Sequence, residues 1–180
     1  NFTLHANTSD ADIIFNGNNG GAAITALTLD MSAGGKAIFN AGLAIGGTGD
    51  ANTLDDYEEG VFEATFEPTS SGSIGVGTNN TLAYTKIGRQ VTVTGLITAG
   101  SVSSPVGDIY INGLPFTIGD LTELAGRTTA SVVYVDASAG SQTVIAVRMF
   151  EAQTRLALKR NAAGIAANDD FYISATYFTA

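Results

Sequence analysis

The 180-residue sequence contains no cysteine, three prolines and a single histidine, His5. Without cysteine, the chain can form no disulfide, no thiolate metal site and no cysteine nucleophile. Because His5 lies at the extreme N-terminus, the serines of the C-terminal part have no histidine base for a catalytic triad. No apolar run approaches the ~20 residues that a membrane-spanning helix needs, so we expect no membrane insertion.

Charged residues are also scarce, at 14% of the chain, and the formal net charge is −9. Residues 1–67 account for this charge, because they hold ten acids and one base, Lys36. Residues 68–180 hold seven acids and seven bases and are neutral overall. The break predicts a boundary near residue 67 or just before it. Neither part has a basic stripe, so nucleic acid is not an expected partner.

Glycine and apolar residues are what the sequence does contain, with 22 glycines and a hydrophobic fraction of 44%. This balance is opposite to that of a disordered chain. In residues 1–53, short apolar runs at 13–15, 24–29 and 37–39 alternate with glycine- and asparagine-rich turns, which predicts short strands. Such strands cannot bury a core within one chain. We therefore expect a β-rich shaft of intertwined chains; a flexible linker is the alternative, which the apolar alternation at 26–31 disfavours.

Residues 61–180 show the two-residue period of β-strands. Phe62, Ala64 and Phe66 alternate with polar residues, and the period is equally regular near the C-terminus, at 171–178. About eight such runs with turns between them predict an antiparallel β-sandwich of jelly-roll type. The expected organisation is a shaft at 1–53, an acidic joint at 54–60 and a head at 61–180, all of it β-structure.

Several motifs resemble the distal shaft and C-terminal head of phage tail fibres and tailspikes. They are DADIIFNGNNGG at 10–21, ITALTLDMS at 24–32, LDDYEEG at 54–60, YTKIGRQV at 84–91 and INGLPF at 111–116. The resemblance implies a homotrimeric, extracellular fibre of the virion tail, whose tip binds a glycan or protein on the bacterial surface. Two alternatives stay open: a glycan-degrading tailspike hydrolase, and a purely structural fibre or capsid-surface module. Because the chain starts at Asn1 rather than methionine, we expect it to continue N-terminally toward other virion tail proteins.

The joint contains the densest cluster of acids in the chain. Asp50, Asp55 and Asp56 are candidate ligands for Ca²⁺, because hard cations bind several oxygens, although their spacing is not that of an EF-hand. Glycosidases use a pair of carboxyl groups, but adjacent acids in a turn are usually a solvated surface. We therefore expect a protein that is not an enzyme, assign no catalytic residue and expect no cofactor other than that Ca²⁺.

Successive antiparallel strands alternate in direction, so every second loop lies at the same end of the head. We call this rule strand parity, and it predicts where the loops of the head lie. If the strands run up and down from residue 61, the segments 68–81, 99–107, 137–142 and 161–170 lie at the free tip, opposite the segments 88–89 and 151–154. Surface loops of this kind commonly carry binding residues. The polar candidates in them for contacts with a receptor are Asn79, Asn80, Asn161, Asn168, Asp169 and Asp170. The alternative is that these Asn and Asp residues only form turns.

Overall fold

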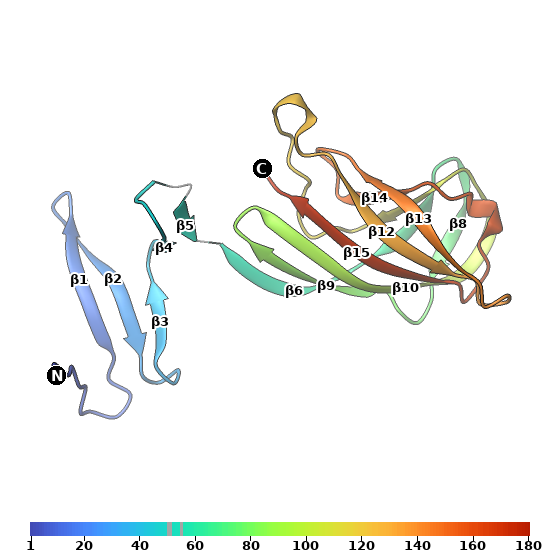
Figure 1. Ribbon diagram of the computed structural model, residues 1–180. Coiled ribbons are helices and arrows are strands. Elements are labelled where there is room, and N and C mark those ends of the chain that lie inside the picture. Colours follow the sequence, from blue (N-terminus) through green and yellow to red (C-terminus); the bar gives the residue numbers. More distant parts are fainter. Residues whose placement is uncertain (50–51, 55) are drawn as a thin grey trace. The chain divides into compact units, whose positions relative to one another are not determined.

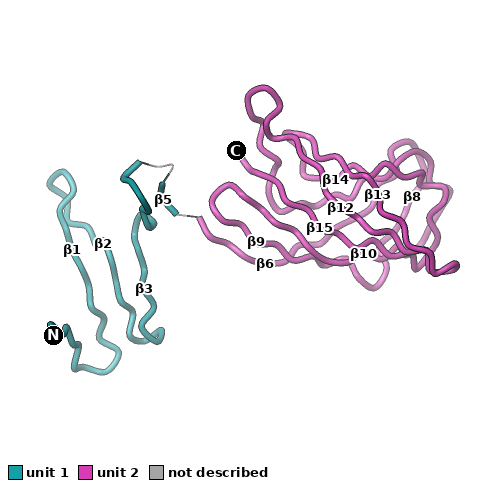
Figure 2. Tube along the Cα trace, viewed as in Figure 1, with its two compact units in different colours: residues 1–55 teal, residues 56–180 magenta. Residues whose placement is uncertain are grey.

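The computed structural model describes residues 1–49, 52–54 and 56–180. The chain divides into two compact units, unit 1 with residues 1–55 and unit 2 with residues 56–180 (Figure 2). Antiparallel strands make up both units (Figure 1). Among the described residues, no helix has the length and apolar content required to cross a bilayer.

Unit 1 contains a three-stranded meander, with strands β1 (Ile13–Asn19), β2 (Ala22–Asp30) and β3 (Lys36–Phe39) in sequence order. The turn between β1 and β2 consists of Gly20 and Gly21, both with positive φ, and the Asn18 side chain accepts a hydrogen bond from the Gly21 N–H. This is the backbone that a two-residue hairpin turn requires, and glycine adopts it without steric cost. A second pair of short strands, β4 (Leu43–Ala44) and β5 (Thr53–Leu54), follows.

Unit 1 has no core of its own in the part that the structure describes. In residues 1–49 and 52–54, no side chain is classed as buried. Phe15 and Phe39 flank Leu27 on one face of the meander, and Ile14 and Ile38 flank Thr28 on the other. These four outer side chains are all between 43% and 51% exposed. Both faces of the meander are therefore apolar, and no other described residue of unit 1 covers them.

Unit 2 is built on one antiparallel sheet with the strand order β6-β9-β10-β15-β12-β13-β14-β11-β7, with β8 paired to β10. The strands are β6 (Tyr57–Glu63), β7 (Thr65–Pro68), β8 (Ser71–Val76), β9 (Thr81–Ile87), β10 (Gln90–Val106), β11 (Ile109–Asn112), β12 (Thr128–Val135), β13 (Gln142–Met149), β14 (Arg155–Leu158) and β15 (Asp170–Phe178). Two single-turn 3₁₀ helices, η2 (Thr122–Leu124) and η3 (Ala162–Gly164), lie in its connections. The all-β, antiparallel prediction for the head is confirmed.

The sheet curls so far that its two edge strands are consecutive in the sequence. Strands β6 and β7 are the two ends of the strand order, yet a single residue, Ala64, separates them in the sequence. Ala64 is fully buried, and its N–H donates to the Asn80 carbonyl. The sequence predicted one continuous strand through residues 62–66; instead the strand changes partner at Ala64, from β9 to β11. The two layers of the expected sandwich are thus parts of one nearly closed sheet.

The interior of unit 2 follows the predicted alternation. On β15, Phe171, Ile173, Ala175 and Tyr177 are at most 5% exposed, while the residues between them face outward. The neighbouring strands contribute inward residues such as Val93 on β10 and Val132 on β12, so one continuous core fills the curled sheet.

Two expected loops are in fact a strand pair. The segments 68–81 and 99–107 were expected as loops because glycine and serine are frequent in them. In the structure β8 pairs with the second half of β10, through Ala99↔Val76 and Ser103↔Ser73. The pairing includes irregular register between these points, which lets β10 bend as it leaves the main sheet.

Unit 2 has two ends, which we name after the strands found there. At the β6 end, the Gly88 N–H donates to the Asp56 carbonyl and the Thr179 N–H donates to the Arg89 carbonyl. At the β8 end lie β8, the β12–β13 turn and the segment 161–169, where the Asn168 N–H donates to the Ala99 carbonyl. Figure 1 shows the C-terminus and the β9–β10 turn at one end and β8 at the other. The segments 137–142 and 161–170 therefore share an end, opposite the 88–89 turn, as strand parity predicts.

Candidate functional site

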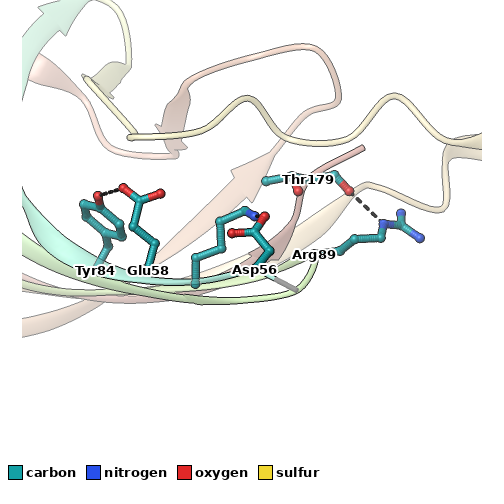
Figure 3. Close-up of polar contacts among 6 residues, drawn as sticks. Asp56, Glu58, Tyr84, Arg89 and Thr179 are labelled. Carbon is teal, nitrogen blue, oxygen red and sulfur yellow. Dashed lines mark hydrogen bonds and ion pairs between the residues drawn. The ribbon is translucent and has the colours of Figure 1, made fainter. Parts of the chain in front are cut away.

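Two acidic residues around the start of β6, Asp56 and Glu58, contact side chains of β9 (Figure 3). Asp56 forms an ion pair with Lys86, which is buried, and the Lys86 ammonium lies 5.4 Å from the centre of the Phe116 ring. A buried lysine needs such partners, because removing an unpaired ammonium from water is costly. The ion pair therefore holds Asp56, the residue before β6, against β9.

Glu58 and Glu59 accept hydrogen bonds from tyrosines. The Tyr84 hydroxyl donates to Glu58, and the Tyr57 hydroxyl donates to Glu59 at 2.9 Å. The hydrogen bond to each carboxylate raises the pKa of Tyr84 and of Tyr57 above the ordinary value. Each described acid of the joint thus has its own partner, and Figure 3 shows the hydrogen bond between Glu58 and Tyr84.

The candidate Ca²⁺ ligands are only partly described. Asp50 and Asp55 lie outside the described residues, and the carboxylate of the third candidate, Asp56, is paired with Lys86. An ammonium on the same carboxylate competes with a bound cation. Within residues 1–49, 52–54 and 56–180, no group of three or more His, Asp or Glu side chains is placed to hold a metal ion.

Four of the six predicted tip residues come together at the β8 end, around Thr98 and Ala99. The Asn79 amide donates to the Thr98 hydroxyl at 3.1 Å, and that hydroxyl donates to Asp170 at 2.6 Å. The Asn168 N–H donates to the Ala99 carbonyl, and the Ala99 N–H donates to the Asp169 carbonyl. Residues from three separate segments therefore meet here through direct hydrogen bonds.

Asp169 corrects the expectation that its carboxylate is available to a receptor, because it is fully buried. It accepts hydrogen bonds from the Tyr134 hydroxyl at 2.6 Å, the Ala137 N–H at 2.9 Å and the Ala166 N–H at 2.8 Å. Burial first, and then this bond to Asp169, raise the pKa of Tyr134 to about 12. Asp169 holds the segment 161–169 and the β12–β13 turn against the barrel, and has no acceptor site facing solvent.

The two remaining candidates, Asn80 and Asn161, make hydrogen bonds other than those of this cluster. Asn80 is half-buried, and its carbonyl accepts from Ala64 at the point where the sheet closes. Asn161 is exposed and caps η3, with its side chain accepting from the Ala163 N–H at 3.0 Å. Turn formation, the alternative given by the sequence, thus describes Asn161 and Asn168 well, since Asn168 has a φ of 72°.

Sequence reasoning missed a polar and aromatic surface on the flank of the barrel. Arg148 on β13 and Lys159 after β14 face outward, and Tyr110 on β11 lies across Ala157 from Arg148. The sequence did carry a signal for this surface. The outward-facing positions of these strands hold basic and aromatic residues in place of the usual threonine and serine. Strand pairing between β11, β14 and β13 could not be read from the sequence, so their proximity could not be either.

Comparisons with known proteins were made for the whole chain. No family model matches the sequence, and no curated protein matches it. Among solved structures, the chain is similar to the Dettilon tailspike protein, at 20% sequence identity and a TM-score of 0.43. The similarity covers 68% of this chain, which spans only 24% of that protein.

Proposed function

We propose that the chain is the tip of a phage tail fibre, in which unit 1 ends a homotrimeric shaft and unit 2 is a head that binds the bacterial surface during adsorption. The observation that carries this proposal is the uncovered apolar sheet of unit 1. A three-stranded meander with apolar side chains on both faces needs partners on both faces, and further copies of the same chain supply them. The motifs at 10–21 and 54–60 support three copies.

The head supports a binding role through its β8 end. The Asn79 amide and the Asp170 carboxylate come from separate segments and are joined through the Thr98 hydroxyl. The backbone of Asn168 is held near them by its hydrogen bond to Ala99, and Asn79 and Asn168 are exposed there. Amide and carboxylate groups fixed by a rigid sheet suit contacts with hydroxyl groups of a surface glycan or polar groups of a surface protein. Three heads on one fibre raise avidity by roughly 10²–10⁴ over a single weak contact.

The oligomeric state is the first test. Light scattering on the purified 180-residue chain is expected to give the mass of a trimer. Changing Phe15→Ser together with Phe39→Ser removes two large side chains from the shared face and is expected to shift the chain toward monomers. Leu124→Ser removes an exposed apolar side chain from the head and serves as the control. A stable monomer of the unchanged chain would contradict the shaft assignment.

Adsorption is the second test. Fluorescently labelled chain is incubated with candidate host bacteria, and unlabelled chain is added to phage infections of the cells that bind it. We expect cell binding and fewer plaques, without release of reducing ends from the cell's polysaccharide. Release of reducing ends would favour the hydrolase alternative. A trimer that neither binds cells nor competes with phage would favour the structural alternative.

A further inference from the structure

The flank of the barrel is hollowed where β11, β14 and β13 run side by side. The hollow, which we call the flank cleft, has a volume of about 380 Å³ and is lined by Thr69, Asp108, Tyr110, Arg148, Phe150 and Lys159 around Ala157 and Leu158. Ala157 pairs with Tyr110 on one side and with Arg148 on the other. A methyl group between two long side chains leaves the space open, so the sequence itself makes the cleft.

Positive charge is concentrated beside this cleft in an otherwise acidic chain. Four of the eight basic residues lie between positions 148 and 160. The Lys159 ammonium donates to Asp108 at 2.6 Å, and the Arg155 guanidinium lies 4.0 Å from the centre of the Tyr110 ring. Arg148 is exposed and has no ion-pair partner among the described residues. Its guanidinium is therefore free to bind an anion that enters the cleft.

The other walls restrict what that anion can be. Tyr110 and Phe150 are half-buried aromatic rings, which suit the C–H face of a sugar ring. Lys159 and Asp108 offer a donor and an acceptor side by side, which suits sugar hydroxyl groups. A guanidinium binds carboxylate or phosphate through two parallel hydrogen bonds. Residues 68–180 are neutral overall and have no basic stripe, so a single anionic group on a sugar fits the cleft better than a long polyanion such as nucleic acid.

Two further hollows lie next to the flank cleft. A second hollow of about 350 Å³ shares Lys159 with it and reaches Asn161, and a third of about 470 Å³ shares Thr69 and Asp108 and also reaches Asn161. Volumes of about 300–1,000 Å³ are usual for small-ligand sites. Neighbouring hollows of this size suit neighbouring units of one saccharide chain.

We propose that the flank cleft binds an anionic saccharide, with Arg148 on its carboxylate or phosphate group, and Tyr110, Phe150, Asp108 and Lys159 on the adjoining sugar. The proposal deepens the proposed function, since it names a class of surface glycan and a site for it on the side of the head. It places recognition on strands of the sheet as well as on the β8 end.

The test measures saccharide binding by the unchanged chain and by variants of Arg148. The probes are an array of oligosaccharides that carry carboxylates (oligogalacturonates among them), the same oligosaccharides with their carboxyls reduced to alcohols, and sugar phosphates. We expect binding to anionic members that weakens as NaCl is raised, and roughly tenfold or greater weakening on reduction of the carboxyls or in Arg148→Gln. Arg148→Lys keeps the positive charge but loses the two parallel N–H donors of the guanidinium, so its affinity is expected to lie between those of the unchanged chain and Arg148→Gln. Preference for the carboxylate or the phosphate set identifies the anionic group.

Arg89→Gln is the matched control, because it removes the same charge at the β9–β10 turn, where Arg89 donates to the Thr179 carbonyl and does not line the cleft. Unchanged thermal unfolding and mass of Arg148→Gln show that folding and assembly are intact. Equal binding by Arg148→Gln and the unchanged chain, no preference for anionic members, or a changed oligomeric mass would overturn the proposal. If Arg148→Gln loses saccharide binding while the unchanged chain fails to bind any cell, the cleft stands and the adsorption function fails. If Arg148→Gln and the unchanged chain bind the saccharides equally while both bind cells, the cleft proposal fails and the adsorption function stands.

Discussion

Asp169 offers a sharp test of how the β8 end is held together. It is a fully buried carboxylate, and its three hydrogen-bond donors come from β12, the β12–β13 turn and the segment that follows η3. One carboxylate oxygen accepts from Tyr134 and Ala166, and the other accepts from Ala137. Asp169→Ala removes both oxygens, so the Ala137 and Ala166 N–H groups lose their partner and the Tyr134 hydroxyl keeps only the Gly164 carbonyl, at 3.5 Å.

The cost follows from counting those donors. A buried donor without a partner costs about 1–3 kcal/mol, so three give at most about 3–9 kcal/mol before relaxation. Water entering at the exposed turns, and relief from burying the charge itself, reduce this, so we expect a loss of about 3–5 kcal/mol in the free energy of unfolding. Asp169→Asn keeps one oxygen for two of the donors and turns its amide toward the third. The Asp169→Asn variant should therefore lose about half as much free energy of unfolding as Asp169→Ala.

Urea unfolding of the full chain, followed by tyrosine fluorescence at a fixed chain concentration, measures these differences. Asp120→Ala is the control, because Asp120 is exposed, and it should change the free energy of unfolding by less than about 0.5 kcal/mol. A loss of under about 1 kcal/mol in Asp169→Ala would refute the assignment of a structural role. It would also restore this carboxylate as a candidate for receptor contact.

Two further predictions concern pH and one glycine. Burial raises the pKa of both Tyr134 and Tyr177 to about 12, whereas an unfolded tyrosine ionises near its ordinary value of 10.0. The stability that the two buried phenols provide is complete below about pH 10 and is lost as pH rises toward about 12. The free energy of unfolding should fall between about pH 10 and pH 12, and two of the six tyrosines should ionise last in an absorbance titration. A free energy of unfolding that stays constant over this range would contradict the burial of the two phenols. In the β8–β10 pair, a Cβ on Gly72 would lie 2.2 Å from the Ser104 carbonyl oxygen, whereas Gly140 has a similarly positive φ but open space. Gly72→Ala should therefore destabilise the chain in thermal melts by at least about 1 kcal/mol more than Gly140→Ala, and equal melting temperatures would argue against the β8–β10 pairing.

Local patterns were enough to predict that the strands of the head alternate between two faces. The alternation from Phe171 to Phe178 predicted that every second residue of β15 shares a face, but both faces hold aromatic residues, so the buried set was established only by the structure. The turn at Gly88 was equally readable, since a glycine between two apolar runs predicts a hairpin, and the structure gives Gly88 the positive φ of such a turn. The antiparallel, all-β class follows from such features alone.

Partner choice was not readable from the sequence. Nothing in residues 61–67 distinguishes the part that pairs with β9 from the part that pairs with β11, because the alternation passes through Ala64 unbroken. The second half of β10 looked like a loop, because its glycines and serines become strand residues only through pairing with β8. Asp169 looked like an exposed turn residue, because its donors are supplied by segments about thirty residues away in the chain as well as by its neighbours. These are non-local contacts that propensity does not encode.

The position of β15 bears on how the protein is made. It follows every other described strand in the chain, yet it lies in the middle of the sheet, between β10 and β12. While a ribosome is still synthesising residues 170–178, the group β6-β9-β10 and the group β12-β13-β14-β11-β7 each have an open edge and uncovered apolar side chains. Open edges of this kind pair readily with other nascent chains. The head can therefore complete its fold only after β15 emerges, and several chains of one polysome are at risk of exchanging this strand until then.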